Sequence, residues 1–265
     1  MRELALFAGA GGGILGGVLL GWRTVCAVEI NAFCARRLMQ RQNEGHLPPF
    51  PVWDDVCSFD GRPWRGTVDV VSGGFPCQDI SAAGKGAGID GKRSGLWGQM
   101  ARIVREVQPR YAFVENSPAL TVRGLGRVLG DLAEMGFDAE WGVLSAASFG
   151  AWHLRNRLWI VAHTTKSGLE GRDESEAKDV FDVDGPGFQA GVCARYRSGS
   201  GQGGQVRKVD EEPAGGSDGT RATWWDVEPG LVRVVHGLAN RVDRIRSLGN
   251  GQVPAVVAGA WETLK

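Results

Sequence analysis

The chain has 265 residues, a formal net charge of zero and 41 glycines. This length is enough to bury the core of one α/β domain with a small appendage, and the glycine content, about twice the usual ~7 %, indicates many loops. A neutral total excludes bulk electrostatic attraction to nucleic acid, so such a partner would have to be bound by a local basic surface.

The first predicted element is a strand over residues 3–7, followed by the glycine-rich stretch 7–13. Glycines after a first strand let the backbone approach a nucleotide closely, and the N-terminus of the next helix adds the positive end of a dipole. Gly11, Gly13 and Gly16 form a GxGxxG pattern. The stretch therefore predicts a nucleotide-type cofactor, and on this pattern alone a nicotinamide dinucleotide is an open alternative.

A second strand is predicted over residues 24–28, and it ends at Glu29. An acid about 20 residues after the first glycine, at the end of the second strand, is placed to accept hydrogen bonds from ribose hydroxyls. Residues 31–44 are predicted to form a helix with Asn31 as its N-cap.

The central predicted strand, residues 68–72, leads into Gly73-Gly74-Phe75-Pro76-Cys77-Gln78. β-branched residues crowd this strand and two glycines end it, so the cysteine follows its carboxyl end. Ligands bind at this edge of open α/β sheets, which makes the thiol a candidate nucleophile, although free cysteine is often only a small buried hydrophobe. Cations favour the reactive thiolate over the unperturbed pKa of about 8.5, and the next loop supplies Lys85, Lys92 and Arg93.

A helix from Gly95 to Val107 and a strand over residues 111–116 are predicted next. Over residues 84–110, six basic residues stand against two acidic ones, a local excess of +4. The strand ends at Glu115 and Asn116, and a charge at the end of an apolar strand is costly unless it is used or paired. A further helix is predicted near residues 119–135.

The last predicted strand, residues 158–162, follows Arg155 and Arg157. Residues at i and i+2 of an extended segment project to the same side. We therefore expect both guanidinium groups on one surface, facing a base carbonyl, a phosphate or Glu115, with a solvated polar face as the alternative.

Between residues 164 and 222 the apolar periodicity disappears and glycine and serine accumulate, which is typical of an irregular or linker segment. Residues 233–246 hold four arginines and one aspartate, a net +3. That charge fits either contacts to a nucleic-acid backbone or a solvated helix face. A final helix is predicted from Pro254 to Leu264, with Pro254 near its first position.

Taken together, these motifs resemble those of the C5-cytosine methyltransferases, in the family's order along the chain. The departures are Ala5, where the family usually has aspartate, Ser117 in the Glu-Asn-Val motif, and His153 in place of a glutamine. The resemblance covers residues 4 to about 260 except for 164–222. The residues that carry it are Pro76-Cys77-Gln78, Glu115-Asn116, Arg155 with Arg157, and Gly249-Asn250 with Pro254.

The resemblance implies the fold of an S-adenosylmethionine-dependent methyltransferase. This is a Rossmann-like α/β fold with a mostly parallel sheet, helices on both faces and a small irregular target-recognition region. We expect residues 1–163 to form the catalytic and cofactor-binding domain and 164–246 the loop-rich target-recognition region. The C-terminal helix, 247–265, is expected to pack back onto the first domain.

The implied function is that of a DNA cytosine-C5 methyltransferase. It would transfer a methyl group from S-adenosyl-L-methionine to a flipped cytosine through a covalent adduct between Cys77 and C6 of the base. Asp55 and Val56 are expected beside the adenine ring, although a helix N-cap at Asp54 or Asp55 is an equal alternative. The predicted catalytic residues are Cys77, Glu115, Asn116, Arg155 and Arg157. The predicted cofactor-binding residues are Phe7, Gly9, Gly11, Gly12, Glu29, Ile30, Asp55, Val56, Pro76, Leu96 and Asn250. The predicted DNA-binding residues are Gln78, Ser81, Lys85, Lys92, Arg93, Arg233, Arg241 and Arg244.

Five cysteines show no CxxC pair and no metal-ligand spacing with the four histidines, and no apolar run approaches the roughly 18 residues of a membrane span. We therefore expect a cytoplasmic monomer with no metal and no membrane contact. The resemblance implies double-stranded DNA as the partner, and whether a cognate restriction endonuclease exists is left open. Three alternatives stay open. They are a methyltransferase acting on RNA, for which a Cys-Phe-Thr signature is missing, a nicotinamide oxidoreductase built on the glycine pattern, and a binding protein that keeps the fold without turnover.

Overall fold

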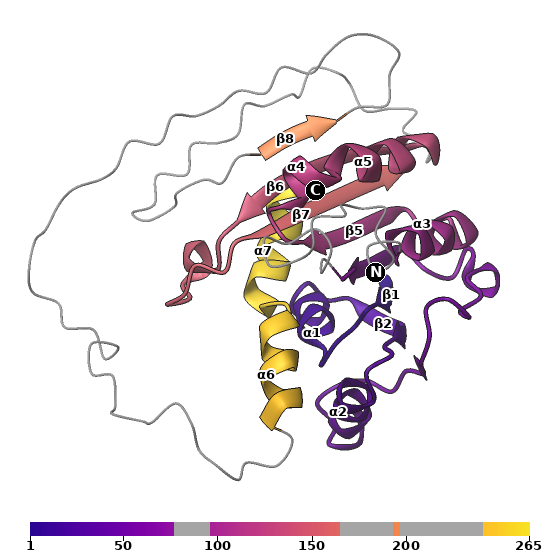
Figure 1. Ribbon diagram of the computed structural model, residues 1–265. Helices are drawn as coiled ribbons and strands as arrows, with labels where there is room; N and C mark the ends of the chain where they lie inside the picture. The colour runs from indigo at the N-terminus through magenta and orange to yellow at the C-terminus, as the bar shows by residue number, and fades with distance from the viewer. Residues whose placement is uncertain (77–95, 165–192, 197–240) are drawn as a thin grey trace, which may run out of the picture.

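The computed structural model describes residues 1–76, 96–164, 193–196 and 241–265, and it is organised around one eight-stranded sheet (Figure 1). The strands lie in the order β3-β2-β1-β4-β5-β7-β6-β8. The strands are β1 (Arg2–Leu6), β2 (Arg23–Val28), β3 (Val52–Trp53), β4 (Val70–Gly74), β5 (Tyr111–Asn116), β6 (Phe137–Leu144), β7 (Arg157–Thr164) and β8 (Cys193–Tyr196). The helices are α1 (Gly12–Leu19), α2 (Ala32–Asn43), α3 (Leu96–Val107), α4 (Leu120–Arg123), α5 (Leu125–Glu134), α6 (Arg241–Asn250) and α7 (Pro254–Leu264), with the short 3₁₀ turns η1 (Arg62–Trp64) and η3 (Ala146–Phe149).

The sheet has a parallel half and an antiparallel half. Strands β3, β2, β1, β4 and β5 pair in parallel, whereas β7, β6 and β8 continue the sheet with antiparallel pairs. Because Asn116 at the end of β5 pairs with Leu158 near the start of β7, β7 begins at the edge where the parallel strands end. The predicted α/β fold is confirmed, and this shared edge brings Arg157 beside Glu115.

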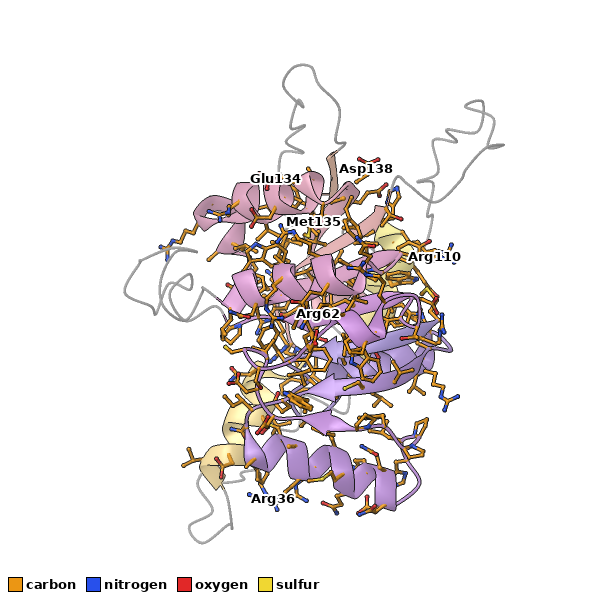
Figure 2. The ribbon with its side chains drawn as sticks, turned by 90° about the vertical axis from the view of Figure 1, so that its right-hand side faces the viewer. Arg36, Arg62, Arg110, Glu134, Met135 and Asp138 are labelled. Carbon is orange, nitrogen blue, oxygen red and sulfur yellow. The ribbon has the colours of Figure 1, made fainter. Side chains whose placement is uncertain are left out.

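Helices cover both faces of the sheet because successive strand residues point to opposite sides. Leu4 and Leu6 of β1 belong to the core under α3 and α5, while Ala5 between them packs with Ile14 of α1 and Leu38 of α2. Helix α7 completes this second face through a cluster that includes Trp261. Figure 2 shows the two ends of the molecule, with Glu134 at the end of α5 and Arg36 on α2 far apart.

One predicted helix forms as expected and another is divided in two. The Asn31 side chain accepts hydrogen bonds from the backbone N–H groups of Phe33 and Cys34, which confirms the predicted N-cap of α2. The helix predicted near 119–135 forms as two, α4 and α5, because the backbone of Gly124 between them is not helical (φ 160°, ψ −1°).

The C-terminal segment lies against the first helix. Gly16 of α1 is buried, and a Cβ at this position would collide with Val257 of α7, so the glycine allows the two helices to pack closely. Helix α6 continues through residue 247, where we had placed a boundary between regions. Within the described ranges, every helix is too short or too polar to cross a membrane.

A carboxyl group of β1 is buried in the sheet, on the strand that leads into the predicted cofactor turn. Glu3 of β1 is 1 % exposed and accepts hydrogen bonds from Thr24 Oγ1 (2.7 Å) and Ser72 Oγ (2.6 Å). Burial raises the pKa of Glu3, and the two hydroxyl donors offset this only in part.

We expect Glu3→Gln to stabilise the protein at pH 8 and to flatten its pH dependence. The pKa of Glu3 is higher in the folded state than in the unfolded state, so the folded state binds more protons. The stability that Glu3 contributes is therefore present below the ordinary carboxyl pKa, and it is lost as pH rises through the folded-state pKa. The neutral amide avoids this loss, because one hydroxyl can still donate to its oxygen while the other turns to accept from its NH2 group. The gain should be about 1 kcal/mol or more, seen as a rise in Tm of about 2–4 °C.

Thermal unfolding of both proteins between pH 4 and pH 8 measures the effect. Glu262→Gln, at an exposed position on α7, is the matched control and should follow the wild-type curve. A wild type at least as stable as Glu3→Gln at pH 8 would show that the burial cost is offset in some other way.

Candidate active site

The candidate site lies where β1, β4 and β5 end. A pocket there is lined by the residues after β1, by the last residues of β4, by Glu115 of β5 and by the turn between α6 and α7. Four segments that are far apart in the sequence thus share one cavity. Its lining residues are Ala5–Gly9, Gly13, Ile14, Ser72–Gly74, Glu115 and Asn250–Gln252.

The turn after β1 has an unusual backbone. Phe7 has a φ of 52°, and Gly9 and Gly11 have φ values of +55° and +95°. A bulky residue at positive φ is strained, and such residues are typical of ligand-binding turns. The positive φ values of this turn therefore support the prediction that it approaches a ligand closely, beyond what the glycine pattern alone indicated.

Glu29, at the end of β2, is fixed by the backbone. Its Oε2 accepts from Gly9 N–H (2.6 Å) and its Oε1 accepts from Asn31 N–H (2.7 Å). The side chain is 9 % exposed. Each oxygen still has a lone pair, so the carboxylate can accept further hydrogen bonds from a ligand beside the glycine turn.

Glu115 and Arg157 form an ion pair across β5 and β7. Arg157 Nε lies 3.0 Å from Glu115 Oε1, and both side chains are largely shielded from solvent. Burial raises the pKa of Glu115, and the Arg157 charge opposes that rise without cancelling it. The carboxyl group is therefore biased toward holding a proton at a higher pH than an exposed glutamate would.

Asn116 contacts the chain just before the predicted nucleophile. Its Nδ2 donates to Phe75 O (3.0 Å), and its Oδ1 accepts from Ser117 N–H. Asn116 is 3 % exposed. This geometry indicates that Asn116 positions the backbone that leads into Pro76 and Cys77.

The prediction that Arg155 and Arg157 share an extended segment was wrong, although the Arg155 charge still acts on both Arg157 and Glu115. Arg155 has a φ of 37°, and β7 begins only at Arg157, so the i, i+2 rule does not apply between them. Its Nη2 donates to Gly249 O (2.8 Å) and also to Gly251 O. Arg155 thus fixes the turn between α6 and α7, while Arg157 binds Glu115.

Asp55 caps a turn, so the alternative of a helix N-cap at Asp54 or Asp55 was wrong, and the contact of Asp55 and Val56 with an adenine ring stays a prediction. Asp55 Oδ1 accepts from Cys57 N–H (2.8 Å), as a capping residue does, and it remains partly exposed. Val56 is 6 % exposed and packs in the core. Ile30 is 76 % exposed beside Glu29, whereas Leu96 is half-buried at the start of α3.

The remaining predicted residues are placed as follows. Pro76 is the last described residue before the nucleophile position, and Asn250 lines the pocket. Arg241 and Arg244 both lie on α6, and Arg244 is exposed. Outside the described residues lie Cys77, Gln78, Ser81, Lys85, Lys92, Arg93 and Arg233. Within the described ranges, no group of three His, Cys, Asp or Glu side chains could hold a metal ion.

Two residues of the site region were missed from the sequence. Gln252 lines the pocket, and nothing but its place next to the Gly-Asn motif signals it. Arg102 of α3 donates to Val56 O (2.9 Å), to Phe59 O (3.0 Å) and to Glu106, and so holds the turn that contains Val56. The i, i+4 spacing of Arg102 and Glu106 was the available signal, but it predicts only a helix-surface pair.

Comparison with known proteins gives one consistent result. Residues 1–213 match the family model described as C-5 cytosine-specific DNA methylase. The chain is 37 % identical over 164 residues to the Type II methyltransferase M.Eco47II of Escherichia coli, covering 60 % of this chain and 38 % of that protein. It is 34 % identical over 163 residues to the Type II methyltransferase M.CviJI of Paramecium bursaria Chlorella virus IL3A, covering 61 % and 42 %. The chain therefore spans about two fifths of the length of these two relatives.

Solved structures agree at the level of the fold. A Spodoptera frugiperda DNMT2 mutant is similar with a TM-score of 0.51 at 19 % identity, covering 66 % of this chain and 53 % of the other. The S. pombe Dnmt2 methyltransferase gives a TM-score of 0.51 at 20 % identity, covering 67 % and 58 %.

Proposed function

Because the chain belongs to the C-5 cytosine-specific DNA methylase family, we propose that it is a DNA (cytosine-5-)-methyltransferase. It transfers a methyl group from S-adenosyl-L-methionine to C5 of a cytosine in double-stranded DNA. The observation that carries this proposal is Glu115, which lines the same cavity as the strained glycine turn and forms an ion pair with Arg157. Such a pair can protonate and orient a pyrimidine ring next to a bound methyl donor.

The residues after β1 and β2 fit S-adenosyl-L-methionine. The cofactor carries a nucleoside with two ribose hydroxyls, and Glu29 is held with free acceptor capacity beside the glycine turn. Gly9 has open space at its Cβ position, so the backbone can approach a ligand there. When bound, the cofactor supplies an electrophilic methyl group from its sulfonium.

Cys77 acts as the nucleophile because C5 of cytosine is too poor in electrons to accept a methyl group unaided. The thiolate forms a bond to C6, and the electron pair of the C5–C6 double bond moves to C5. After methylation, loss of the C5 proton returns an electron pair to the ring and expels Cys77 as the thiolate. Asn116, through Phe75 O, holds the backbone that presents this residue.

Glu115 and Arg157 stabilise the ring while it carries charge. A protonated Glu115 donates to N3, and Arg157 donates to O2 while it orients Glu115. The raised pKa of Glu115 suits this role, because the carboxyl group must hold a proton near neutral pH. Base extrusion from the duplex costs a few kcal/mol and precedes these contacts.

Target choice is assigned in this proposal to residues 164–246. The stretch differs in composition from the catalytic part, and in it β8 adds an edge strand to β6. Basic residues on α6, including the exposed Arg244, would contact the DNA backbone.

The function is tested by incubating the purified protein with labelled S-adenosyl-L-methionine and either duplex DNA or tRNA. The expected result is 5-methylcytosine in DNA, together with a covalent complex when the DNA contains 5-fluorocytosine. Methylation of tRNA alone would favour the RNA alternative. A protein that binds the cofactor but methylates neither substrate would favour a binding protein.

Glu29→Ala is expected to weaken S-adenosyl-L-methionine binding by about 10–100-fold, which is about 1.4–2.8 kcal/mol. The variant loses a charge-assisted acceptor for the ribose and also frees two backbone N–H groups that order the glycine turn. Calorimetric titration measures the Kd, and Glu44→Ala on the surface after α2 is the control. An unchanged Kd in a folded Glu29→Ala protein would remove Glu29 from the cofactor site.

A further inference from the structure

Gln252 packs between glycines at the start of α1 and the end of β4. It lies in the short segment between α6 and α7 and lines the candidate pocket. A Cβ added at Gly12 would collide with its backbone carbonyl, and one at Gly13 would collide with its Oε1. A Cβ at Gly74 would lie 3.1 Å from its Nε2. Three glycines, two at the start of α1 and one at the end of β4, therefore leave room for the backbone and side chain of this one residue.

The amide of Gln252 reaches the catalytic acid. It forms a side-chain hydrogen bond with Glu115, and the amide N–H donates because the bond favours the charged carboxylate. Glu115 Oε2 and Gln252 Nε2 both lie beside Gly74, while Arg157 Nε lies 3.0 Å from Oε1. The carboxylate is therefore held by one donor at each oxygen.

The backbone around Gln252 is anchored independently. Arg155 Nη2 donates to the carbonyl groups of Gly249 and Gly251, and α7 begins at Pro254, whose φ is fixed. Because residues on both sides of Gln252 are held, the position of its amide follows from the fold and not from a mobile surface rotamer.

We propose that Gln252 is a positioning residue for Glu115, and that its amide orients the carboxyl group in both protonation states. The amide N–H donates to the carboxylate, and after a half-turn of the side-chain amide the Oε1 accepts from the protonated acid. Arg157 can donate to an oxygen of either form, but it has no acceptor and so cannot accept from the protonated acid. This inference rests on the proposed function and assigns Gln252 a role within the same site.

Gln252→Met tests the proposal because methionine is similar in length and fills the same space without hydrogen bonds. Loss of a donor to the charged form should raise the pKa of Glu115 by about one unit. If protonated Glu115 is the active form, the alkaline limb of the pH–kcat profile moves to higher pH by the same amount. The kcat at the optimum should fall roughly tenfold, with the cofactor KM changed less than twofold.

Gln252→Glu is the second variant and keeps the shape of the side chain. Two neighbouring carboxyl groups cannot both ionise easily, so one of them should titrate at a still higher pH than Glu115 does in Gln252→Met. Gln40→Met, at an exposed position on α2, is the matched control and should keep the wild-type profile.

A readout that does not depend on turnover is the titration of the Glu115 carboxyl carbon by NMR, with the resonance assigned from its absence in Glu115→Gln. A wild type and a Gln252→Met protein that titrate at the same pH would overturn the proposal, whatever the activity. Variants with a lower Tm and a higher cofactor KM but unshifted titration would show that Gln252 acts only as a packing wedge. Failure of the proposed function is a separate outcome, in which the wild type makes no 5-methylcytosine.

Discussion

Cys77→Ser should reduce methyl transfer by roughly 10³-fold or more while leaving S-adenosyl-L-methionine affinity within twofold. The thiolate is the attacking form, and an unperturbed thiol ionises at a pKa of about 8.5, far below any serine hydroxyl. The loss of a nucleophile removes a whole covalent step and not a single contact. Cofactor binding should survive, because the Glu29 contacts come from β2 and the turn after β1.

Single-turnover methylation and calorimetric cofactor binding measure the two halves of this prediction. Cys57→Ser is the matched control, because the Cys57 side chain is exposed and the substitution keeps the backbone hydrogen bond from residue 57 N–H to Asp55 Oδ1. Trapping on 5-fluorocytosine DNA should yield a covalent complex with the wild type and with Cys57→Ser but not with Cys77→Ser. Appreciable turnover by Cys77→Ser would reject Cys77 as the nucleophile.

The sequence predicted the elements whose signals are local. The buried strands at 111–116 and 158–162, the Asn31 cap and the helix from Pro254 to Leu264 all follow from periodicity and capping residues. The placement of Glu29 and Glu115 at strand ends followed as well, because a polar residue after an apolar run marks the end of a buried strand.

What the sequence did not predict depends on backbone conformation and on contacts distant in the chain. Arg155 takes a positive φ where an extended backbone was expected, and no residue pattern around it signals that conformation. Gln252 contacts Glu115 although the two residues are 137 positions apart in the sequence. The turn that holds Gln252 packs there only because Gly12, Gly13 and Gly74 lack side chains. In the same way the GxGxxG pattern suggested a dinucleotide, whereas Gly13 and Gly16 face the C-terminal segment 252–257.

The site residues therefore fall into two functional groups that sequence motifs did not separate. Glu115 lines the pocket and Arg157 pairs with it, which fits the proposal that these two act on the substrate. Asn116 and Arg155 hold backbone carbonyls, one before the nucleophile and the others in the α6–α7 turn. Motif membership alone would have given all four residues the same role. Only their hydrogen-bond partners distinguish a residue that can act on the substrate from one that positions the backbone.

Glu115→Gln should lower kcat by about 10²–10⁴-fold with a much smaller effect on the cofactor KM, because it removes the group that gives a proton to N3. Glutamine keeps the shape of the side chain and can still accept from Arg157 Nε, so the ion-pair geometry at 3.0 Å is perturbed little. Burial raises the pKa of Glu115, so the wild type should lose activity on the alkaline side as this carboxyl group ionises, and the variant should lack that limb.

A pH–rate series under saturating cofactor and DNA measures this effect, with Glu134→Gln at the exposed end of α5 as the control. The double variant of Glu115→Gln and Arg157→Lys should be only slightly slower than Glu115→Gln alone. Groups that act as a unit lose their joint contribution when either is removed. Fully additive losses, or an alkaline limb that persists in Glu115→Gln, would mean that some other group protonates the ring and that Glu115 serves mainly to hold Arg157.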